Sequence, residues 1–439
     1  MTTELEQRWQ EIMDAGGPEP FIKKELKRMG VYRSYKPNII TLPTESEKRQ
    51  AVEASRREAK ATSELRQYVQ EARKATHIMH LGPDIFWKDF LKEDHFDPFA
   101  LERRLQDREL PLMNSVEDVL TFLREAVPDL TIPMLRGYCT HRQMSQVYHY
   151  RTFAIPKKTG GVRNIWAPLP RLKAMQKHIQ IQIVEKMVTH GAAHGFVAGK
   201  SIFSNASEHT NSSLIVGVDL KDFFPTFTFP RVRGLFRSYG YSLGVATLLA
   251  AICTESSRRE LILDGETYYI ATGPRVLPQG SPASPALTNA LSLRLDRRLS
   301  TYAGQNDWRY TRYADDLTFS RVNNGEKYTN LQIKKLLSML NRVTEEEGMR
   351  INRKKTHFMR KGCKQQVTGL IVNGTGTPRV PKERRKLLKA ALHNAQNGVT
   401  VENALEIEQL LGHSAFVYMT DMESGRQLLD GFGSLSGES

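Results

Sequence analysis

The stretch WRYTRYADDLTFS, residues 308–320, places two adjacent acids, Asp315 and Asp316, between two runs rich in aromatic and β-branched side chains. Such runs favour β-strands, and two strands joined by a short connection form a hairpin. The sequence therefore predicts a hairpin that carries both carboxylates at its tip. Aspartate is also common in tight turns for purely structural reasons, so the pair alone leaves a structural turn and a catalytic site both open.

The chain is strongly basic, with 63 Lys and Arg against 48 Asp and Glu in 439 residues and a net charge of +15. The excess is concentrated in two segments. Residues 136–200 contain eleven Lys or Arg and one acid, and residues 350–397 contain thirteen and one. A charge run can be no more than a solvated face, but two such segments around a less basic middle favour two walls of a nucleic-acid channel.

The cysteines and the hydropathy pattern argue against a secreted or membrane protein. Cys139, Cys253 and Cys363 lie far apart, which disfavours both a disulfide framework and a cysteine-based zinc site. The first ten residues contain no hydrophobic signal segment. The longest apolar stretch, GVATLLAAIC at 244–253, is too short to span a bilayer. We therefore expect a cytoplasmic protein with no membrane partner.

Helical patterns occur at both ends of the chain. Residues 4–30 predict two short helices broken at Gly16-Gly17-Pro18, and residues 45–75 predict a highly charged helix. We find no catalytic motif in the first 80 residues. The segment from about 380 predicts helices, the first with an apolar stripe and basic residues suited to phosphate contacts. The stripe is Leu387, Leu388, Ala391 and Leu392, and the basic residues are Arg384, Arg385, Lys386 and Lys389.

A third acid follows a second predicted strand. In SLIVGVDLKDFFPTF, residues 213–227, an apolar run typical of a buried strand ends in Asp219. Three acids at neighbouring strand ends could hold two divalent ions about 3.5–4 Å apart. One such ion activates a 3′-hydroxyl and the other binds the triphosphate and the leaving pyrophosphate. Asp219, Asp315 and Asp316 therefore indicate polymerase chemistry.

With these acids, residues from about 130 to 380 resemble a reverse transcriptase, because further motifs follow in the order of that family. The resemblance implies an α+β right-hand polymerase: a helical N-terminal extension at 1–80, fingers and palm at 81–375, and a helical thumb at 376–439. It implies RNA-directed DNA synthesis with two Mg²⁺ ions. The implied catalytic residues are Asp219, Asp315, Asp316 and Lys355, and the implied metal ligands are Asp219, Leu220, Asp315 and Asp316.

Three motifs carry the resemblance beyond the acids. The fingers loops that bind the triphosphate are similar to RTFAIPKKTGGVRNIWAP (151–168). The motif that contacts nucleotide and template is similar to GPRVLPQGSPASPALTNAL (273–291). A palm motif resembles INRKKTHF (351–358), and Lys355 in it matches a lysine proposed to protonate pyrophosphate. Alone, these are a polar hairpin, a common turn and a surface lysine. Ser281 as a hydrolase nucleophile is disfavoured, because its surroundings lack the second glycine of a nucleophile elbow. The implied nucleotide-binding residues are Lys157, Lys158, Arg163, Asp222, Phe224, Gln279 and Gly280.

Phe224 bears on the choice of sugar. In the family that the chain resembles, the residue five after the first catalytic aspartate packs under the sugar, and an aromatic ring there clashes with a 2′-hydroxyl. Phe224 therefore favours dNTPs over rNTPs. The alternative is a core aromatic beside Phe223.

Two further motifs resemble the hallmarks of retron-type bacterial reverse transcriptases. They lie in GFVAGKSIFSNASEH (195–209) and QQVTGLIVNG (365–374). The resemblance implies a cognate structured non-coding RNA, priming from a guanosine 2′-hydroxyl, a branched multicopy single-stranded DNA product, and an effector or toxin protein in an anti-phage system. The residues implied in RNA and primer recognition are Asn205, His209, Val367, Thr368 and Gly369.

Several alternatives stay open from the sequence. His209 could be a core or capping histidine rather than an RNA contact. His190 and His194 have a spacing that could place two zinc ligands on one helical face, but the glutamate of the HExxH motif is absent. The rival functions are another bacterial defence reverse transcriptase without a branched primer, and a non-catalytic RNA-binding scaffold. The three acids disfavour the scaffold.

Overall fold

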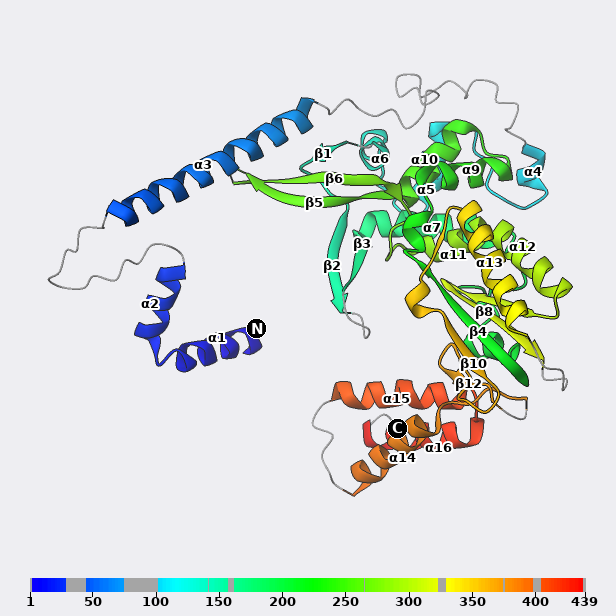
Figure 1. The fold of residues 1–439 in the computed structure, drawn as a ribbon. Helices are drawn as coiled ribbons and strands as arrows, with labels where there is room; N and C mark the ends of the chain where they lie inside the picture. The colour runs from blue at the N-terminus through cyan, green and yellow to red at the C-terminus, as the bar shows by residue number, and fades with distance from the viewer. Residues whose placement is uncertain are drawn as a thin grey trace. The chain divides into compact units, whose positions relative to one another are not determined.

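The computed structural model describes residues 2–28, 45–74, 102–140, 142–156, 162–263, 265–322, 329–373, 376–397 and 404–436. The chain divides into two units, residues 1–70 and 71–439. The first unit is helical (Figure 1), as the sequence predicts: α1 is Thr2–Asp14, α2 is Pro18–Arg28 and α3 is Glu45–Lys74. Gly16 and Gly17 separate α1 from α2 with φ angles of +85° and +110°, a conformation that glycine adopts without steric cost.

An antiparallel five-stranded sheet, which we call the central sheet, organises the second unit. Its strand order is β10-β4-β8-β7, and β9 pairs with the end of β4. The strands are β4 (Ser212–Lys221), β7 (Arg309–Tyr313), β8 (Asp316–Val322), β9 (Arg350–Ile351) and β10 (His357–Arg360). The predicted hairpin of residues 308–320 is therefore present as β7 and β8, and the predicted buried strand is β4.

The two faces of β4 have different surroundings, because side chains alternate along a strand. Leu214, Val216 and Val218 point into the main hydrophobic core, which includes residues of three helices. The helices are α11 (Ser284–Leu291), α12 (Leu293–Gln305) and α13 (Asn330–Glu346). The residues between them in sequence, Ile215 and Gly217, point to the opposite face together with Asp219. The acid therefore lies on the face of the sheet that these helices do not cover.

The region before and after β4 supplies two smaller sheets and a helical core. One sheet is the hairpin of β2 (Tyr150–Pro156) and β3 (Val162–Pro168). The other has the order β1-β6-β5. Its strands are β1 (Met144–Ser145), β5 (Glu255–Leu263) and β6 (Glu266–Val276). The helices are α4 (Glu102–Gln106), α5 (Val116–Arg124), α6 (Ile132–Cys139), α7 (Pro170–Gln182), α9 (Phe229–Tyr239) and α10 (Leu243–Cys253).

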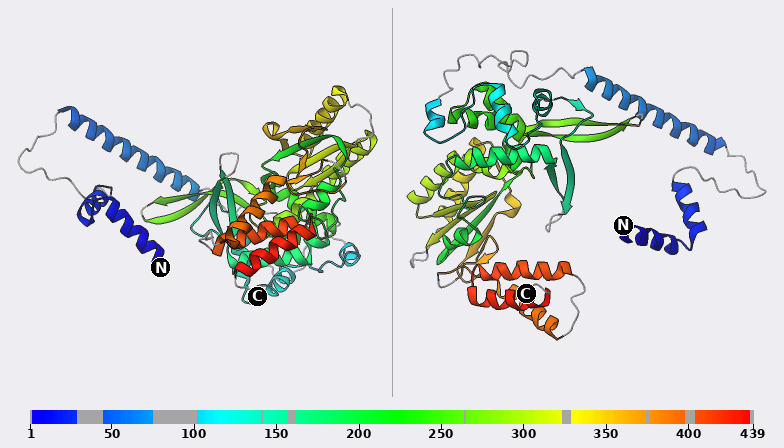
Figure 2. Two further views of the ribbon diagram at one scale, coloured as in Figure 1. Left: turned by 90° about the horizontal axis from the view of Figure 1, so that it is seen from below. Right: turned by 180° about the vertical axis from the view of Figure 1, so that it is seen from behind.

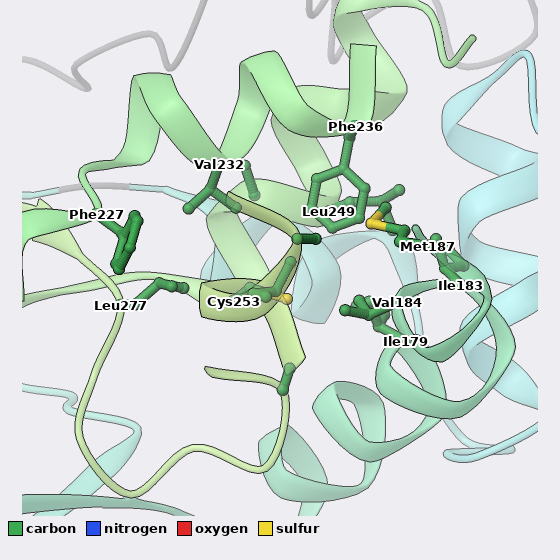
Figure 3. Close-up of a cluster of buried hydrophobic side chains, with 14 of the residues drawn as sticks. Ile179, Ile183, Val184, Met187, Phe227, Val232, Phe236, Leu249, Cys253 and Leu277 are labelled. Atoms are coloured by element: carbon green, nitrogen blue, oxygen red, sulfur yellow. The ribbon is translucent and has the colours of Figure 1, made fainter. Parts of the chain in front are cut away.

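Figure 3 shows a cluster of buried side chains within this helical core. Side chains from α7 and the turn after it, including Ile179 and Met187, meet Phe236 of α9 and Leu249 of α10. Every residue of α10 from Gly244 to Cys253 is buried. The apolar stretch that the sequence shows at 244–253 is therefore a helix enclosed by protein. Among the described residues, no helix combines the length and apolar character needed to cross a membrane.

Three C-terminal helices form a second core. α14 (Lys382–Gln396), α15 (Ala404–Tyr418) and α16 (Met422–Ser436) lie side by side in the views of Figures 1 and 2. Leu388, Val417 and Phe432 pack there with Ile215 of β4. The predicted apolar stripe of the first helix is wrong at Leu387, whose residue surface is 70% exposed. Leu388 is buried and Ala391 and Leu392 are partly buried against the same cluster, whereas Leu387 lies one helical step outside this stripe.

Two short elements link this second core to the central sheet. The helix α8 is Ile202–Ser207, and the strands β11 (Gln366–Val367) and β12 (Leu370–Ile371) form a tight hairpin. Ala206 of α8 and Val367 of β11 belong to the same hydrophobic cluster as the C-terminal helices. The arrangement brings residues near 205 next to residues near 368, although more than 150 positions separate them in sequence.

Candidate active site on the central sheet

Strand register brings the three acids together. Asp219 of β4 lies directly opposite Asp316 of β8, and the backbone N–H of Leu220 donates to the carbonyl of Asp315 at 2.9 Å. Asp315 follows Ala314, which adopts a φ of +55° in the turn between β7 and β8. We call Asp219, Asp315 and Asp316 the acid cluster. Sequence motifs 96 positions apart thus meet at one place because β4 and β8 are neighbours.

Asp219 is held by two donors from one short segment. Lys355 Nζ donates to Asp219 Oδ2 at 2.7 Å, and Asn352 Nδ2 donates to Oδ1 at 3.0 Å. The backbone N–H of Asn352 also donates to the Asp219 carbonyl at 2.8 Å. Sequence reasoning identified Lys355 but missed Asn352. Its position three residues before that lysine, in the same basic motif, is the only signal that could have found it.

The surroundings of the acid cluster raise the pKa values of two of its carboxyl groups. Desolvation by the surrounding protein and the charges of Asp315 and Asp219 raise the pKa of Asp316 to about 6. Desolvation also raises the pKa of Asp315, with a further contribution from the charge of Asp219. The pKa of Lys355 is raised, chiefly by its hydrogen bond to Asp219. Partly desolvated carboxylates that lie close together are typical of sites that bind cations.

The donor set fits divalent cations in chemistry, because carboxylate oxygen is the ligand that Mg²⁺ prefers. The side chains are not arranged as a finished site: no group of three His, Cys, Asp or Glu in the described part of the chain is placed to hold a metal. Both oxygens of Asp219 accept hydrogen bonds instead. Leu220, also expected among the ligands, has a buried apolar side chain, so it could offer only its backbone carbonyl.

Residues predicted to bind the nucleotide lie beyond Asp219 along the chain and on the adjoining hairpin. Phe224 is half-buried at the start of a 3₁₀ turn, Phe224–Thr226, with its ring edge-on to Phe223 at 5.8 Å between centroids. Asp222 is exposed with a φ of +49°. Arg163 is exposed on β3, and its positive charge acts on Asp315. Lys157 and Lys158 lie outside the described residues.

Gln279 and Gly280 are fixed against the β2–β3 hairpin. The backbone N–H of Trp166 donates to the Gln279 carbonyl at 2.8 Å. Gly280 has a φ of +127°, and a Cβ atom there would lie 2.8 Å from the Trp166 carbonyl oxygen, so the close approach of the two segments requires glycine. Ser281 is buried and donates to Gln176 Oε1 at 2.8 Å. It is a structural hydroxyl rather than an exposed nucleophile.

A fully buried ion pair supports the acid-bearing turn, and sequence reasoning missed it. Arg312 donates through Nη2 and Nε to both carboxylate oxygens of Asp296, at 2.7 and 2.8 Å. Its Nη1 donates to the Ala314 carbonyl at 3.2 Å, and Tyr310 donates to Asp296 Oδ1 at 2.7 Å. Arg312 and Asp296 have no exposed surface. The guanidinium therefore fixes the residue immediately before Asp315 from inside the protein.

The two motifs assigned to RNA recognition contact one another. Thr368 and Gly369 form the two-residue loop between β11 and β12, with φ angles of +45° and +88°. A positive φ is unusual for a β-branched residue, and Thr368 is held there by hydrogen bonds. Its Oγ1 donates to the Ile202 carbonyl at 3.1 Å and accepts from Asn205 Nδ2 at 3.4 Å. Val367 is buried beside them.

Neither Asn205 nor His209 offers surface to an RNA in this structure, since both are fully buried. His209 hydrogen bonds to Ser320 Oγ at 2.8 Å and to Thr311 Oγ1 at 2.7 Å, which places its ring in the core beneath the β7–β8 hairpin. Burial lowers its pKa to about 3. Any contribution of these two residues to primer recognition would act through the segments they join.

The segment with His190 and His194 is not helical, so the spacing does not place the two rings on one helical face. His194 Nδ1 lies 2.9 Å from Ser204 Oγ, and His190 Nδ1 accepts from the backbone N–H of Ala192 at 3.1 Å. Burial lowers the pKa of His194 to about 4. Both rings therefore have local structural partners.

Comparisons with known proteins identify the family of the chain. A family model described as reverse transcriptase (RNA-dependent DNA polymerase) matches residues 155–373. The retron Mx162 reverse transcriptase of Myxococcus xanthus is 39% identical over 95% of this chain and 86% of its own length. The retron Mx65 enzyme of the same organism is 42% identical over 74% and 73%, and the retron Ec86 enzyme of Escherichia coli is 30% identical over 74% and 91%.

Among solved structures, telomerase from Candida albicans in complex with a fragment of telomeric RNA aligns with 65% of this chain and 59% of its own, at 12% identity and a TM-score of 0.40. That likeness is too distant to carry an inference. The family match and the mixture of sheets and helices confirm the predicted fold class, an α+β right-hand polymerase.

Proposed function

Because the chain belongs to the family of retron reverse transcriptases, which are RNA-directed DNA polymerases, we propose that it copies its own structured non-coding RNA into branched multicopy single-stranded DNA. Synthesis starts from a guanosine 2′-hydroxyl within that RNA. The observation that carries the proposal is the acid cluster, in which Asp219 lies opposite Asp316 beside Asp315. A non-catalytic RNA-binding scaffold would have no need for three carboxylates gathered at one place.

The acid cluster and the backbone carbonyl of Leu220 would hold two Mg²⁺ ions. When bound, these ions lower the pKa of the attacking hydroxyl and neutralise the triphosphate. The protein itself would position the carboxylates that hold these ions. The β4–β8 register fixes two of the carboxylates relative to each other, and Arg312 fixes the turn that carries the third. Lys355, beside Asp219, would supply the proton that the departing pyrophosphate takes up.

The incoming dNTP would lie between the acid cluster and the β2–β3 hairpin. Arg163, with Lys157 and Lys158, would bind its phosphates, and Phe224 would pack under its sugar. Gln279 and Gly280 would contact the base pair from the segment fixed to Trp166. Asp222 completes the proposed set. These assignments would place the triphosphate on the side of Asp219 nearer the C-terminal end of β4.

We assign residues 81–375 to fingers and palm and residues 376–439 to the thumb, with residues 1–80 as a helical extension. The second core supports the thumb assignment, since it joins α14–α16 to Ile215 of the palm strand. Lys386 and Lys389 are exposed on α14 and would contact phosphates. Arg384 and Arg385 are half-buried and have partners within the helices, near His413 and Asp421.

The Asn205–Thr368 contact supports branched priming. It holds a loop with an unusual positive φ at Thr368, close to the cluster that joins the central sheet to the proposed thumb, where the primer would run. An internal 2′-hydroxyl must be placed for in-line attack more accurately than an ordinary 3′-end. The enzyme would work in the cytoplasm with its RNA, dNTPs and an effector or toxin protein, as part of an anti-phage system. Another defence reverse transcriptase without branched priming is the second candidate, because the acid cluster by itself fits both enzymes.

The product distinguishes these candidates. Nucleic acid from a strain that expresses the protein with its native RNA locus is treated with RNase or with a debranching enzyme and run on a denaturing gel. We expect a discrete short DNA whose mobility shifts on debranching. Thr368→Val should reduce this species far more than extension of an annealed primer, by on the order of 100-fold if the hydroxyl is misplaced by ~1 Å. Ser207→Ala, on the helix α8 that carries Asn205 but with its hydroxyl bonded only to the Phe203 carbonyl, is the control. A product insensitive to debranching would favour the second candidate.

A further inference from the structure

A cavity of about 390 Å³ lies between α6, the segment around β1 and the start of β5 (Figure 1). We call it the α6–β5 cavity. Its volume is within the range of small-ligand sites, which is about 300–1,000 Å³. None of the residues that line it belongs to the central sheet, so it is separate from the acid cluster. The lining includes Tyr138, Tyr148, His149, Glu255, Arg142 and Val147.

Glu255 provides a buried acceptor in this cavity. Its Oε1 accepts from the backbone N–H of Ser256 at 2.7 Å and from Arg258 Nη2 at 3.3 Å. Within the described parts of the chain, Oε2 accepts no hydrogen bond. The Tyr148 hydroxyl and Arg258 Nε are also buried without a partner among those residues. Because buried polar groups are costly when unsatisfied, this wall favours a ligand that brings an N–H donor to the carboxylate.

Aromatic rings form another part of the wall. The centroids of the Tyr138 and His149 rings are 4.3 Å apart, and both residues are half-buried. Burial lowers the pKa of His149, so its ring is neutral at pH 7. Neutral rings are surfaces on which planar bases stack, and proteins hold unpaired RNA bases in this way. The aromatic wall therefore favours a nucleobase as the ligand.

The rim of the α6–β5 cavity is basic. Arg142 is exposed there, and a second hollow adjoins the cavity along Gly137, Thr140 and Arg142. Arg136 lines this second hollow. Both arginines belong to the basic segment 136–200. Their charge disfavours a lysine or arginine side chain of another protein as the ligand, and favours a base that is joined to phosphates.

We propose that the α6–β5 cavity binds one unpaired nucleotide of the RNA, with the base against Tyr138 and His149 and its exocyclic amino group donating to Glu255. Adenine, cytosine and guanine carry such a group, whereas uracil presents carbonyl oxygens that a carboxylate repels. This inference rests on the proposed function for the presence of an RNA, and adds to it an RNA contact outside the acid cluster. A nucleotide bound there would anchor a single-stranded part of the RNA on the polymerase.

The test compares fluorescein-labelled octamers of cytidine and of uridine ribonucleotides, which differ only in the hydrogen-bonding edge of the base. Fluorescence anisotropy measures their binding to the full-length protein in EDTA, with excess unlabelled RNA–DNA heteroduplex to occupy the proposed channel. We expect the cytidine octamer to bind about 10-fold more tightly, as for one hydrogen bond to a charged group. Glu255→Gln, whose amide offers a donor as well as an acceptor, should bring the ratio of the two affinities toward one.

Val147→Trp tests the cavity without altering Glu255. Val147 lines the cavity and is 63% exposed, so a larger side chain there would fill the space without disturbing the core. It should lower the affinity for the cytidine octamer to that for the uridine octamer. Val188→Trp, at a position that is 55% exposed and does not line the cavity, is the control and should leave both affinities unchanged. A thermal melt of each variant verifies that it is folded.

A wild-type ratio of one overturns the inference, as does a ratio that neither Glu255→Gln nor Val147→Trp changes. Cytidine monophosphate that competes as well as the cytidine octamer would also overturn it, because the ligand would then be a free nucleotide. Binding of a labelled heteroduplex is measured separately. A wild type that does not bind the heteroduplex contradicts the proposed function instead, so the two failures are distinguishable.

Discussion

Lys355 Nζ donates to Asp219 Oδ2 at 2.7 Å, so an ammonium group stands beside the carboxylate that the proposed chemistry gives to a divalent cation. Asn352 covers the other carboxylate oxygen. A cation bound by Asp219 would compete with the lysine for Oδ2 and would leave the ammonium closer to the path of the leaving pyrophosphate. Lys355, the proposed general acid, is thus hydrogen-bonded to Asp219, one of the proposed metal ligands.

Lys355→Met should separate these two roles. We expect kcat for dNTP addition to fall by about 100-fold or more, because a positioned general acid contributes about 10²–10⁴-fold. The Mg²⁺ concentration that gives half-maximal rate should fall as well, since Asp219 loses its competing partner. Lys354→Met, an exposed lysine in the same turn, is the control and should change neither quantity by more than about 2-fold. An unchanged Mg²⁺ requirement in Lys355→Met would contradict the competition.

The raised pKa of Asp316 predicts how stability depends on pH. Its folded-state pKa is about 6 against an ordinary value of 3.8, so the folded protein binds this proton more tightly than the unfolded chain. The resulting stabilisation is present below about pH 4 and is lost as the pH rises through 6. Asp316→Asn should therefore melt at a higher temperature than the wild type at pH 7.5 in EDTA, and at the same temperature near pH 4.

Adding Mg²⁺ at pH 7.5 should reverse this difference, because the wild type gains stability from a cation that the variant binds less well. Asp107→Asn, at an exposed turn, is the control for loss of one negative charge. A variant that melts below the wild type at pH 7.5 in EDTA would show that Asp316 is not under electrostatic stress. Differential scanning fluorimetry without nucleic acid is sufficient for all of these measurements.

Phe224 should discriminate between sugars. Its ring is half-buried, packed edge-on to Phe223, and five residues after Asp219. Phe224→Val should raise the relative kcat/KM for rNTPs over dNTPs by about 10–100-fold, because removal of the ring opens space for a 2′-hydroxyl. The dNTP rate of the same variant is the internal control for the fold. If the variant selects dNTPs as strongly as the wild type, the ring is a core aromatic and the selectivity has another source.

The buried Arg312–Asp296 pair should act on catalysis through the turn at Ala314. The double variant Asp296→Leu/Arg312→Met removes both charges. It should be more stable than Asp296→Leu alone, which leaves a buried guanidinium unpaired at a cost of about 3–5 kcal/mol. The double variant still lacks the hydrogen bond to the Ala314 carbonyl, so we expect kcat to fall by 10-fold or more. The KM for dNTP should change little.

Tyr310→Phe is the control for this prediction. It removes one hydrogen bond to Asp296, worth about 1 kcal/mol, without touching the contact at Ala314. Its kcat should stay near the wild-type value. A double variant with wild-type kcat would limit the ion pair to a role in stability.

Local patterns were sufficient to predict the elements that carry the site. The alternation around Asp315 and Asp316 predicts the β7–β8 hairpin, and the apolar run before Asp219 predicts β4. The family resemblance linked these motifs before any strand pairing was known. What it could not supply is the register that sets Asp219 opposite Asp316, since pairing between residues 97 positions apart depends on the whole sheet.

The residues that sequence reasoning missed are those whose role depends on a distant partner. Arg312 reads as one more basic residue in a basic chain, and nothing near it indicates Asp296 in α12. Asn352 lies in the motif that was identified through Lys355, but its partner, Asp219, is on β4. The prediction that Leu387 belongs to the buried stripe was wrong, because a local apolar run does not show which of two adjacent leucines faces the core.

The most direct test of the central claim is primer extension by Asp315→Ala/Asp316→Ala on an RNA template with Mg²⁺ and dNTPs, measured together with the affinity for that RNA. The account predicts loss of DNA synthesis with RNA affinity close to that of the wild type, because the acids serve the chemistry and the basic surfaces serve binding. DNA synthesis at the wild-type rate in the double variant would contradict the assignment of the acid cluster as the catalytic centre.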